Sequence, residues 1–247
     1  MSLRIAFDLD GVLADMEGEL VRQAETLFGE GVKKVPPRPQ ERGSEGPEPD
    51  AGKEEASAED APPLTTITLT ARQEHLLWRH VQLIDNFWET LPETEPGVVQ
   101  RLAATAVERR WEVIFLTRRP QTLGRTSQLQ TQRWLESKGF ALPSVFVVHR
   151  SRGRIAEALG LDLVVDDRPE NCLDVVVDSR ARAILVWRDD QEHLPAAARR
   201  LGIGVVRSAN ECLDILAQAD HPPDVDRPGI VTRVMRALGL KEPIGQD

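Results

Sequence analysis

The sequence of 247 residues has little cysteine and no long apolar run. Two cysteines, Cys172 and Cys212, are too few for a disulfide framework or for a zinc site built on cysteines. A membrane-spanning helix needs about 20 consecutive apolar residues, and no such run occurs. A secretory signal is not expected either, because Asp8 and Asp10 interrupt the apolar run at 3–13. We therefore expect a cytoplasmic protein with two reduced thiols and no membrane partner.

An excess of positive charge is also missing, since 31 Lys and Arg residues face 40 Asp and Glu residues, a net charge of −9. This balance disfavours binding to nucleic acid or anionic membranes through bulk charge, but it allows a small anionic substrate at one local site. An apolar fraction of 40% is ordinary for a globular protein, and the chain is long enough to bury a core. The sequence does not predict an oligomeric state.

The segment 35–63 has almost no large apolar residue. It contains seven of the 17 prolines, and its central part, 41–60, has eight acidic residues against two basic ones. Such a segment cannot bury enough apolar surface to offset the conformational entropy lost on ordering. We expect a flexible acidic insert, either a solvated loop or, less favoured, an acidic docking arm.

Six short and almost continuously apolar runs predict strands that are buried on both faces of a parallel sheet. They cover residues 4–8, 112–117, 145–149, 163–166, 183–187 and 204–207. Stretches with helical periodicity lie between them, for instance at 97–110, 127–138, 153–159 and 171–177. This alternation is typical of a doubly wound, Rossmann-like α/β fold, in which ligands bind beyond the carboxyl ends of the strands.

Two further helical stretches, 15–28 and 70–89, lie between the first two predicted strands and do not fit the alternation. An apolar stripe at helical spacing runs along the second. We expect residues 16–89 to form a small helical module that contains the acidic insert. Residues 1–15 and 90–247 then form the Rossmann-like core.

The first predicted strand ends in Phe-Asp-Leu-Asp-Gly-Val, which places Asp8 and Asp10 two residues apart. Side chains at i and i+2 of an extended chain lie on the same side, so both carboxylates can face one small volume. They repel each other unless a cation or a shared proton compensates. An EF-hand loop is excluded, because its glycine comes at the sixth position and Gly11 would be at the fourth. We favour a functional site over a simple Asp-Gly turn.

The second predicted strand ends in Leu-Thr-Arg-Arg-Pro, with Thr117 at its carboxyl end. In a parallel sheet this hydroxyl lies at the same edge as Asp8, where it can hold a phosphate oxygen beside free backbone N–H groups. Arg118 and Arg119 add positive charge, and an arginine fork suits phosphate. Taken alone, the motif is explained more simply by a threonine that caps a turn before Pro120, followed by two solvated arginines.

The fourth predicted strand leads into Val-Asp-Asp-Arg-Pro-Glu-Asn, so Asp166 and Asp167 lie at this edge too. Asp167 has an alternative role as part of a helix cap, because Glu170 follows three residues later. Asp166 directly follows an apolar run and requires a cation or hydrogen-bond donors. Together with Asp8 and Asp10, these carboxylates offer the hard oxygen ligands that Mg²⁺ prefers. Because a metal lets an anionic nucleophile approach phosphate, the sequence predicts a Mg²⁺ site for phosphate chemistry.

The order of these three motifs resembles the haloacid dehalogenase-like superfamily on its phosphatase side. The resemblance covers residues 3–15 and 112–172, and it is greatest to 5′-nucleotidases, deoxyribonucleotidases and polynucleotide-end phosphatases. It implies that Asp8 is a nucleophile that becomes an aspartyl-phosphate, and that Asp10 protonates the leaving group and then activates water. It also implies that Thr117 binds the phosphate and that the helical module is a cap over a small phosphorylated substrate. The implied Mg²⁺ ligands are Asp8, Asp10, Asp166 and Asp167.

One position departs from the family pattern. The family has a lysine near the start of the helix before the last acidic motif, where this chain has His-Arg-Ser-Arg-Gly-Arg at 149–154. Arg154 fits that position best and Arg152 second, and we predict that Arg154 and Arg118 bind phosphate. Glycine-rich loops of the dinucleotide or P-loop type are absent. Hydrolysis of a nucleotide or another small phosphate ester is the favoured function. The missing lysine leaves a catalytically weak ligand- or partner-binding relative as the alternative.

Overall fold

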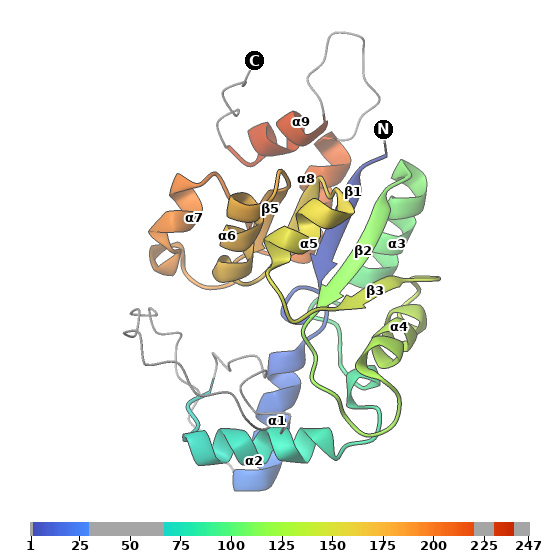
Figure 1. The fold of residues 1–247 in the computed structure, drawn as a ribbon, viewed down its shortest axis with the longest axis vertical. Coiled ribbons are helices and arrows are strands. Elements are labelled where there is room, and N and C mark those ends of the chain that lie inside the picture. Colours follow the sequence, from blue (N-terminus) through green and yellow to red (C-terminus); the bar gives the residue numbers. More distant parts are fainter. Residues whose placement is uncertain (1, 30–66, 220–229, 240–247) are drawn as a thin grey trace.

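The predicted strands form one parallel sheet in the order β3-β2-β1-β4-β5-β6. The computed structural model describes residues 2–29, 67–219 and 230–239. Its strands are β1 (Arg4–Asp8), β2 (Glu112–Thr117), β3 (Ser144–Val147), β4 (Leu163–Asp166), β5 (Arg182–Val186) and β6 (Gly204–Val206). Each begins close to its predicted start, and the doubly wound α/β fold is confirmed (Figure 1).

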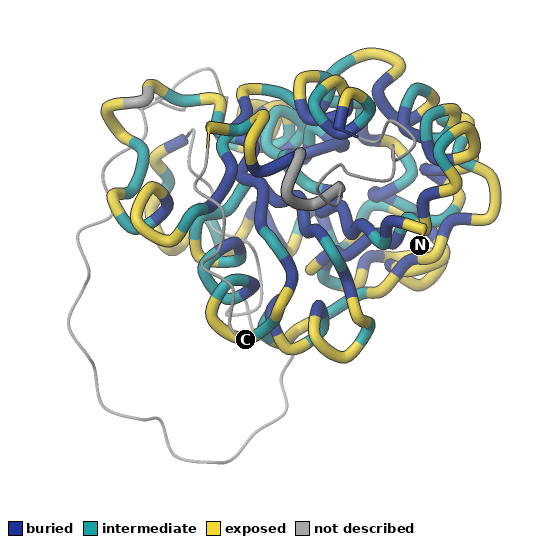
Figure 2. Tube along the Cα trace, turned by 90° about the horizontal axis from the view of Figure 1, so that it is seen from above, coloured by how far each residue is buried: buried dark blue, intermediate teal, exposed yellow. Residues whose placement is uncertain are grey.

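Both faces of the sheet are covered, which explains why the strands are apolar throughout. Ile5 and Phe7 of β1 belong to one hydrophobic core together with residues of α3 (Val98–Arg109), α4 (Ser127–Ser137) and α8 (Ala209–Ala219). Ala6, between them, belongs to the opposite core. Figure 2 shows the buried strands inside the molecule and exposed turns around them.

The opposite face of the sheet carries α5 (Arg152–Leu159), α6 (Pro169–Asp178) and α7 (Ala196–Arg200). Near the chain ends, α9 (Ile230–Ala237) packs against α8 (Figure 1). No helix of the described part of the chain is long and apolar enough to cross a membrane. Both cysteines are buried and free, as expected.

Two helices between β1 and β2, α1 (Met16–Phe28) and α2 (Ala71–Gln82), lie side by side beyond the carboxyl ends of the strands (Figure 1). The single helix predicted at 70–89 is wrong. It ends at Gln82, and a short 3₁₀ helix, η2 (Phe87–Glu89), follows. The backbone between α2 and η2 is bound by the loop after β2. Leu123 N–H donates to the Gln82 carbonyl and Asn86 N–H donates to the Leu123 carbonyl, both at 2.9 Å. The predicted insert at 35–63 lies outside the described residues.

The two segments that join the helical module to the core are paired with each other. Ala14 forms an antiparallel bridge with Glu93, and Asp15 N–H donates to the Pro92 carbonyl at 2.9 Å. Asp15 then caps α1 by accepting from Gly18 N–H at 2.9 Å. The module is therefore attached beside the ends of β1, where the candidate residues lie.

Candidate active site

The site lies where the strand order reverses. Chain connections run from β1 to β2 and β3 on one side and then to β4, β5 and β6 on the other. The carboxyl ends of β1 and β4 are neighbours in the sheet, and these strands end in Asp8 and Asp166. Ligands of doubly wound sheets bind at such a reversal. The first and third predicted motifs therefore meet, as the parallel sheet requires.

Asp167 packs against the turn that follows β1. Gly11 has a φ of +82°, and a Cβ there would lie 1.9 Å from Asp167 Oδ2, so the turn requires glycine for both conformation and space. Arg188, which follows β5, holds the same turn by donating to the Gly11 and Val12 carbonyls. Sequence reasoning missed Arg188, because its target is a backbone carbonyl far away in the sequence.

The alternative role of Asp167 in a helix cap is not what the structure shows. The residue that precedes α6 is Arg168, and no side chain caps this helix. Asp167 Oδ1 is instead buried with no hydrogen-bond partner. A buried carboxylate oxygen without a donor favours a cation as its missing partner.

Arg152 supplies the fixed cation of the site. Its Nη2 lies 2.5 Å from Asp8 Oδ1 and its Nε lies 3.6 Å from Asp166 Oδ2. The three side chains are almost fully buried. A further guanidinium nitrogen, Nη1, is buried with no hydrogen-bond partner, so it is available to a substrate oxygen.

Arg154 was predicted to take this place, and that prediction is wrong. Arg152 is the first residue of α5, where side chains lean back toward the helix start and the strand ends. Arg154 follows two residues later, about 200° around the helix, and is exposed. Gly153 lets α5 approach α6 closely, because a Cβ there would lie 2.0 Å from the Asp174 carbonyl oxygen.

Asp166 is held mainly by neutral donors from the loop after β4 and from α6. It accepts from the Arg168 N–H at 2.9 Å and from Asn171 Nδ2 at 2.9 and 3.0 Å. Together with the Arg152 contact, these bonds engage both of its oxygens. Asp166 is thus a fixed anchor, whereas Asp167 keeps an oxygen free.

The charges of this cluster are not balanced. Burial, followed by the negative charge of Asp166, raises the pKa of Asp8 well above its usual range, although Arg152 opposes this. Burial likewise raises the pKa of Asp166. For Asp167, burial and the Asp166 charge raise the pKa to about 8. Arg152 and Arg168 oppose these shifts, but the pKa values of all three acids remain raised, which leaves room for a further cation.

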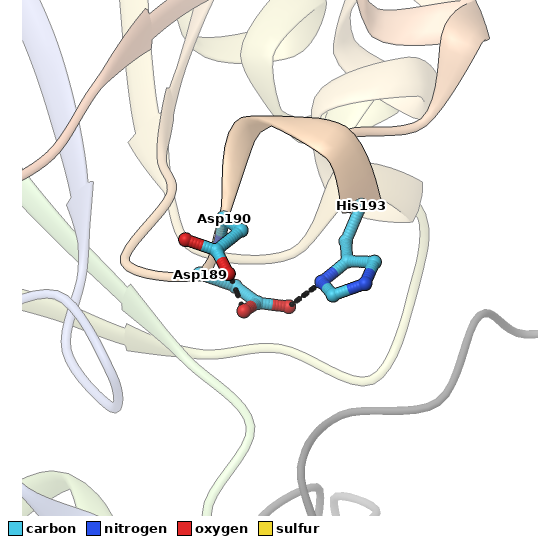
Figure 3. Close-up of side chains that lie close together, drawn as sticks. All are labelled: Asp189, Asp190 and His193. Atoms are coloured by element: carbon cyan, nitrogen blue, oxygen red, sulfur yellow. Dashed lines mark hydrogen bonds and ion pairs between the residues drawn. The ribbon is translucent and has the colours of Figure 1, made fainter.

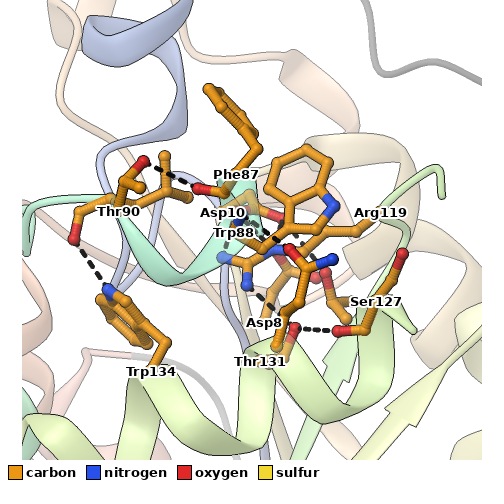
Figure 4. A network of polar contacts seen from close by, with 12 residues as sticks. Asp8, Asp10, Phe87, Trp88, Thr90, Arg119, Ser127, Thr131 and Trp134 are labelled. Carbon is orange, nitrogen blue, oxygen red and sulfur yellow. Dashed lines mark hydrogen bonds and ion pairs between the residues drawn. The ribbon is translucent and has the colours of Figure 1, made fainter. Parts of the chain in front are cut away.

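Asp10 faces a separate arginine. Arg119 donates from Nη2 to Oδ1 at 2.7 Å and from Nε to Oδ2 at 2.9 Å (Figure 4). The Thr117 hydroxyl also donates to Oδ2, at 3.0 Å. Arg119 is buried, whereas Arg118, predicted to bind phosphate, is exposed. Thr117 and Arg119 are two residues apart, so the same spacing rule that pairs Asp8 with Asp10 would have indicated the inward direction of Arg119.

Asp8, Asp10, Asp166 and Asp167 do not form a tight set of three metal-binding oxygens. Within the described residues, three candidate ligand atoms lie within 4.8 Å of one another only at Asp189, Asp190 and His193, on the surface after β5 (Figure 3). His193 Nδ1 is 3.1 Å from Asp189 Oδ2 there. At the strand ends, Arg152 lies between Asp8 and Asp166, and Asp10 is turned toward Arg119.

No family model and no curated protein matches the sequence. Among solved structures, a HAD family hydrolase from Deinococcus radiodurans with bound phosphate and sodium has a TM-score of 0.52 at 16% identity, over 88% of this chain and 96% of that chain. A hydrolase from Pseudomonas syringae has a TM-score of 0.49 at 16% identity, over 88% of this chain and 99% of that chain. With its parallel sheet and the helical module after β1, the chain has the fold of the haloacid dehalogenase-like hydrolases.

Proposed function

We propose that this protein is a Mg²⁺-dependent phosphomonoester hydrolase of the haloacid dehalogenase-like superfamily. The observation that supports it most is the Arg152 guanidinium, which contacts Asp8 and Asp166 and keeps Nη1 unpaired. A buried cation beside a buried carboxylate, at the end of two central strands, fits an anionic substrate that is attacked by that carboxylate.

The residues fit a magnesium ion, because Asp167 has a buried oxygen without a donor and the cluster has more negative than positive charge. Asp8 and Asp167 would hold it, since the oxygens of Asp166 are already bonded to Asn171 and Arg168. Mg²⁺ would neutralise phosphate charge during nucleophilic attack. The assignment of Asp10 as a metal ligand is less favoured, because Arg119 and Thr117 bind its carboxylate.

The chain's own residues account for the proton and phosphoryl transfers. A carboxylate oxygen of Asp8 attacks phosphorus, the bond from phosphorus to the ester oxygen breaks, and Asp10 gives its proton to that oxygen. Asp10 then takes a proton from water as the water attacks the phosphorus of the aspartyl-phosphate. Inorganic phosphate leaves and the Asp8 carboxylate is regenerated. Arg152 holds phosphate oxygens throughout, and the Thr117 hydroxyl at the end of β2 donates to Asp10.

We further propose a small phosphorylated substrate that lies between the core and the helices α1 and α2. A nucleotide is the first candidate, because the opening motif resembles nucleotidases, and a phosphorylated DNA end is the second. The alternative of a catalytically weak relative depended on the missing lysine. Arg152 places a cation beside Asp8, so the structure offers this alternative less support.

The test is hydrolysis of p-nitrophenyl phosphate by the purified chain, with Mg²⁺ or with a chelator. We expect turnover that requires the metal and that Asp8→Asn abolishes. A panel of nucleoside monophosphates, sugar phosphates and 3′-phosphorylated DNA ends then identifies the substrate class. Absence of metal-dependent turnover on every member of the panel would contradict the proposal and leave a binding role.

A further inference from the structure

The contacts of Arg119 extend beyond Asp10 and form a buried chain. Its third nitrogen, Nη1, donates to the Thr131 hydroxyl at 2.9 Å, and that hydroxyl donates to the Ser127 carbonyl at 2.7 Å. The guanidinium carbon lies 5.0 Å from the ring centre of Trp88, a cation–π contact (Figure 4). Arg119 is thus fixed from α4 on one side and from η2 on the other.

Trp88 is itself held in place. Its Nε1 donates to the Pro120 carbonyl at 2.9 Å, and its backbone N–H donates to Gln130 Oε1 at 3.0 Å. The ring of Phe87 packs edge-on against it, with ring centres 4.9 Å apart. This arrangement limits the rotamers open to Arg119, because a buried side chain with satisfied donors has no alternative partners.

Arg119 is not placed to bind the substrate phosphate. It is 1% exposed, and the nitrogens that form its fork point at the Asp10 carboxylate. Arg152, by contrast, has an unpaired nitrogen beside Asp8. The two arginines therefore have different tasks.

On the basis of the proposed phosphatase function, we propose that Arg119 is a positioning residue that fixes the Asp10 carboxylate for proton transfer to the leaving oxygen. The two-residue spacing brings Asp10 to the correct side of the chain but does not fix its side-chain torsions. The Arg119 fork and the Thr117 hydroxyl fix them. A misplacement of about 1 Å in a catalytic group can lower a rate about 10²-fold.

This role predicts a dependence on the leaving group. A basic alkoxide needs a proton from Asp10 as the ester bond breaks, whereas p-nitrophenolate leaves without one. kcat/KM reports the step in which phosphate is transferred to Asp8. Only this step depends on the leaving group, because both esters give the same aspartyl-phosphate. An Arg119 variant should therefore lose more kcat/KM on an alkyl phosphate than on an aryl phosphate.

The experiment compares wild-type protein with Arg119→Lys, on β-glycerophosphate and p-nitrophenyl phosphate with Mg²⁺. We expect kcat/KM to fall about 10²-fold on the alkyl ester and less than about threefold on the aryl ester. The matched control is Arg133→Lys, an exposed arginine of α4 that pairs with Glu89, and we expect it to change neither value. In an Asp10→Asn background, Arg119→Lys should have no further effect on the alkyl ester.

Equal losses on both esters, or an additive loss in the Asp10→Asn background, would overturn the positioning role. Thr131→Val is a second variant that removes the outer anchor of Arg119 and leaves its contact with Asp10, and a smaller loss with the same leaving-group dependence is expected. If both variants lose their fold by circular dichroism, Arg119 is a stability residue and the inference is wrong. If wild-type protein hydrolyses neither ester, the proposed function fails first and the positioning role fails with it.

Discussion

Two arginine–carboxylate sites lie at the carboxyl ends of the central strands, one at β1 and β4 and the other at β1 and β2, and they differ in how completely their charges and donors are matched. Arg152 contacts Asp8 and Asp166 and has one unpaired nitrogen, and the neighbouring Asp167 has an unpaired oxygen. Arg119 serves Asp10 alone, and its remaining nitrogen bonds within the fold. The first site has a nitrogen that can bind an anion and a carboxylate oxygen that can bind a cation, whereas the charged groups of the second site are already paired with each other.

The presence or absence of hydrogen-bond partners distinguishes the buried polar groups that can bind a ligand from those that cannot. Unpaired buried polar atoms lower stability, and where two of opposite character lie at the edge of the sheet at which ligands bind, they favour a ligand as the missing partner. Arg152 Nη1 and Asp167 Oδ1 are such atoms. Arg119 and Asp10 instead resemble a finished hydrogen-bond network, which gives a fixed geometry. The experiments that follow test this contrast.

The largest effect is expected from Asp8→Asn. Loss of the nucleophile should lower kcat by at least about 10⁴-fold, since an amide is a poor nucleophile. Without metal, the variant should be at least as stable as wild-type protein, because one of several repelling buried charges is removed. Phosphatase assays and thermal unfolding in a chelator measure the two outcomes. A wild-type rate would refute Asp8 as the nucleophile.

The next effect concerns Arg152. Arg152→Ala should lower kcat/KM about 10²- to 10³-fold, because a fixed charge beside the transferring phosphate is lost, and Arg152→Lys should recover part of it. Arg154→Ala is the matched control from the same helix, and its exposed side chain should not matter. If Arg154→Ala were the more damaging change, the placement of the two arginines would have to be reversed.

A smaller effect is expected when pH and metal are varied together. Asp167 has a folded-state pKa of about 8, above its value in the unfolded chain. The metal-free folded state binds the extra proton, so its stability should fall as the pH rises from about 4 to about 8. Saturating Mg²⁺ should remove this fall, and the difference in Tm at the upper pH should be about 3 °C.

Thermal unfolding at several pH values, in chelator and in Mg²⁺, measures this dependence. Asp167→Asn is the control, because it should show a smaller pH dependence in the chelator and a weaker response to Mg²⁺. A metal-free Tm that rises over this interval would contradict the charge imbalance at Asp167.

The smallest effect is expected at Glu95, a carboxylate whose donors are well matched. Burial opposes its ionisation, but bonds from the N–H groups of Asn210 and Ala209, from the Asn210 side chain and from Arg188 lower its pKa below the usual value. Glu95→Gln should cost about 1 kcal/mol at neutral pH, as loss of a helix cap does.

A lowered folded-state pKa contributes stability above the unfolded-state pKa and loses it as the pH falls through the folded-state value. The difference between wild type and Glu95→Gln should therefore shrink below about pH 4. Urea unfolding at neutral and acidic pH measures it. A constant difference over this range would show that the Glu95 charge does not stabilise the start of α8.

Much of the site could be predicted because its parts are local. Asp8 and Asp10 share one side of the chain through their spacing, and the parallel sheet brings Asp166 to Asp8 through strand pairing. The distinction between Arg152 and Arg154 could not be predicted, since it depends on the residue at which α5 begins and on its rotation. A shift of one or two residues at a helix start redirects every side chain that follows.

The role of Arg119 could not be predicted for a different reason. The two-residue spacing from Thr117 indicates that Arg119 rather than Arg118 points inward, but it does not indicate which groups Arg119 contacts. A charged side chain is buried only where a partner compensates, and here the partners come from the turn after β1, from η2 and from α4. The same holds for the end of α2, where Leu123 in the loop after β2 binds the Gln82 carbonyl and the Asn86 N–H within a stretch that has helical periodicity.

The sequence by itself determined the strands, the doubly wound fold class and the edge at which the carboxylates gather, because burial on two faces and the i, i+2 rule act over a few residues. Only the tertiary structure decided which arginine forms an ion pair with which acid and which polar atoms remain unpaired. Those outcomes depend on helix rotation and on contacts between residues far apart in the chain, as between Arg152 and Asp8 or between Arg119 and Asp10. No local pattern encodes them.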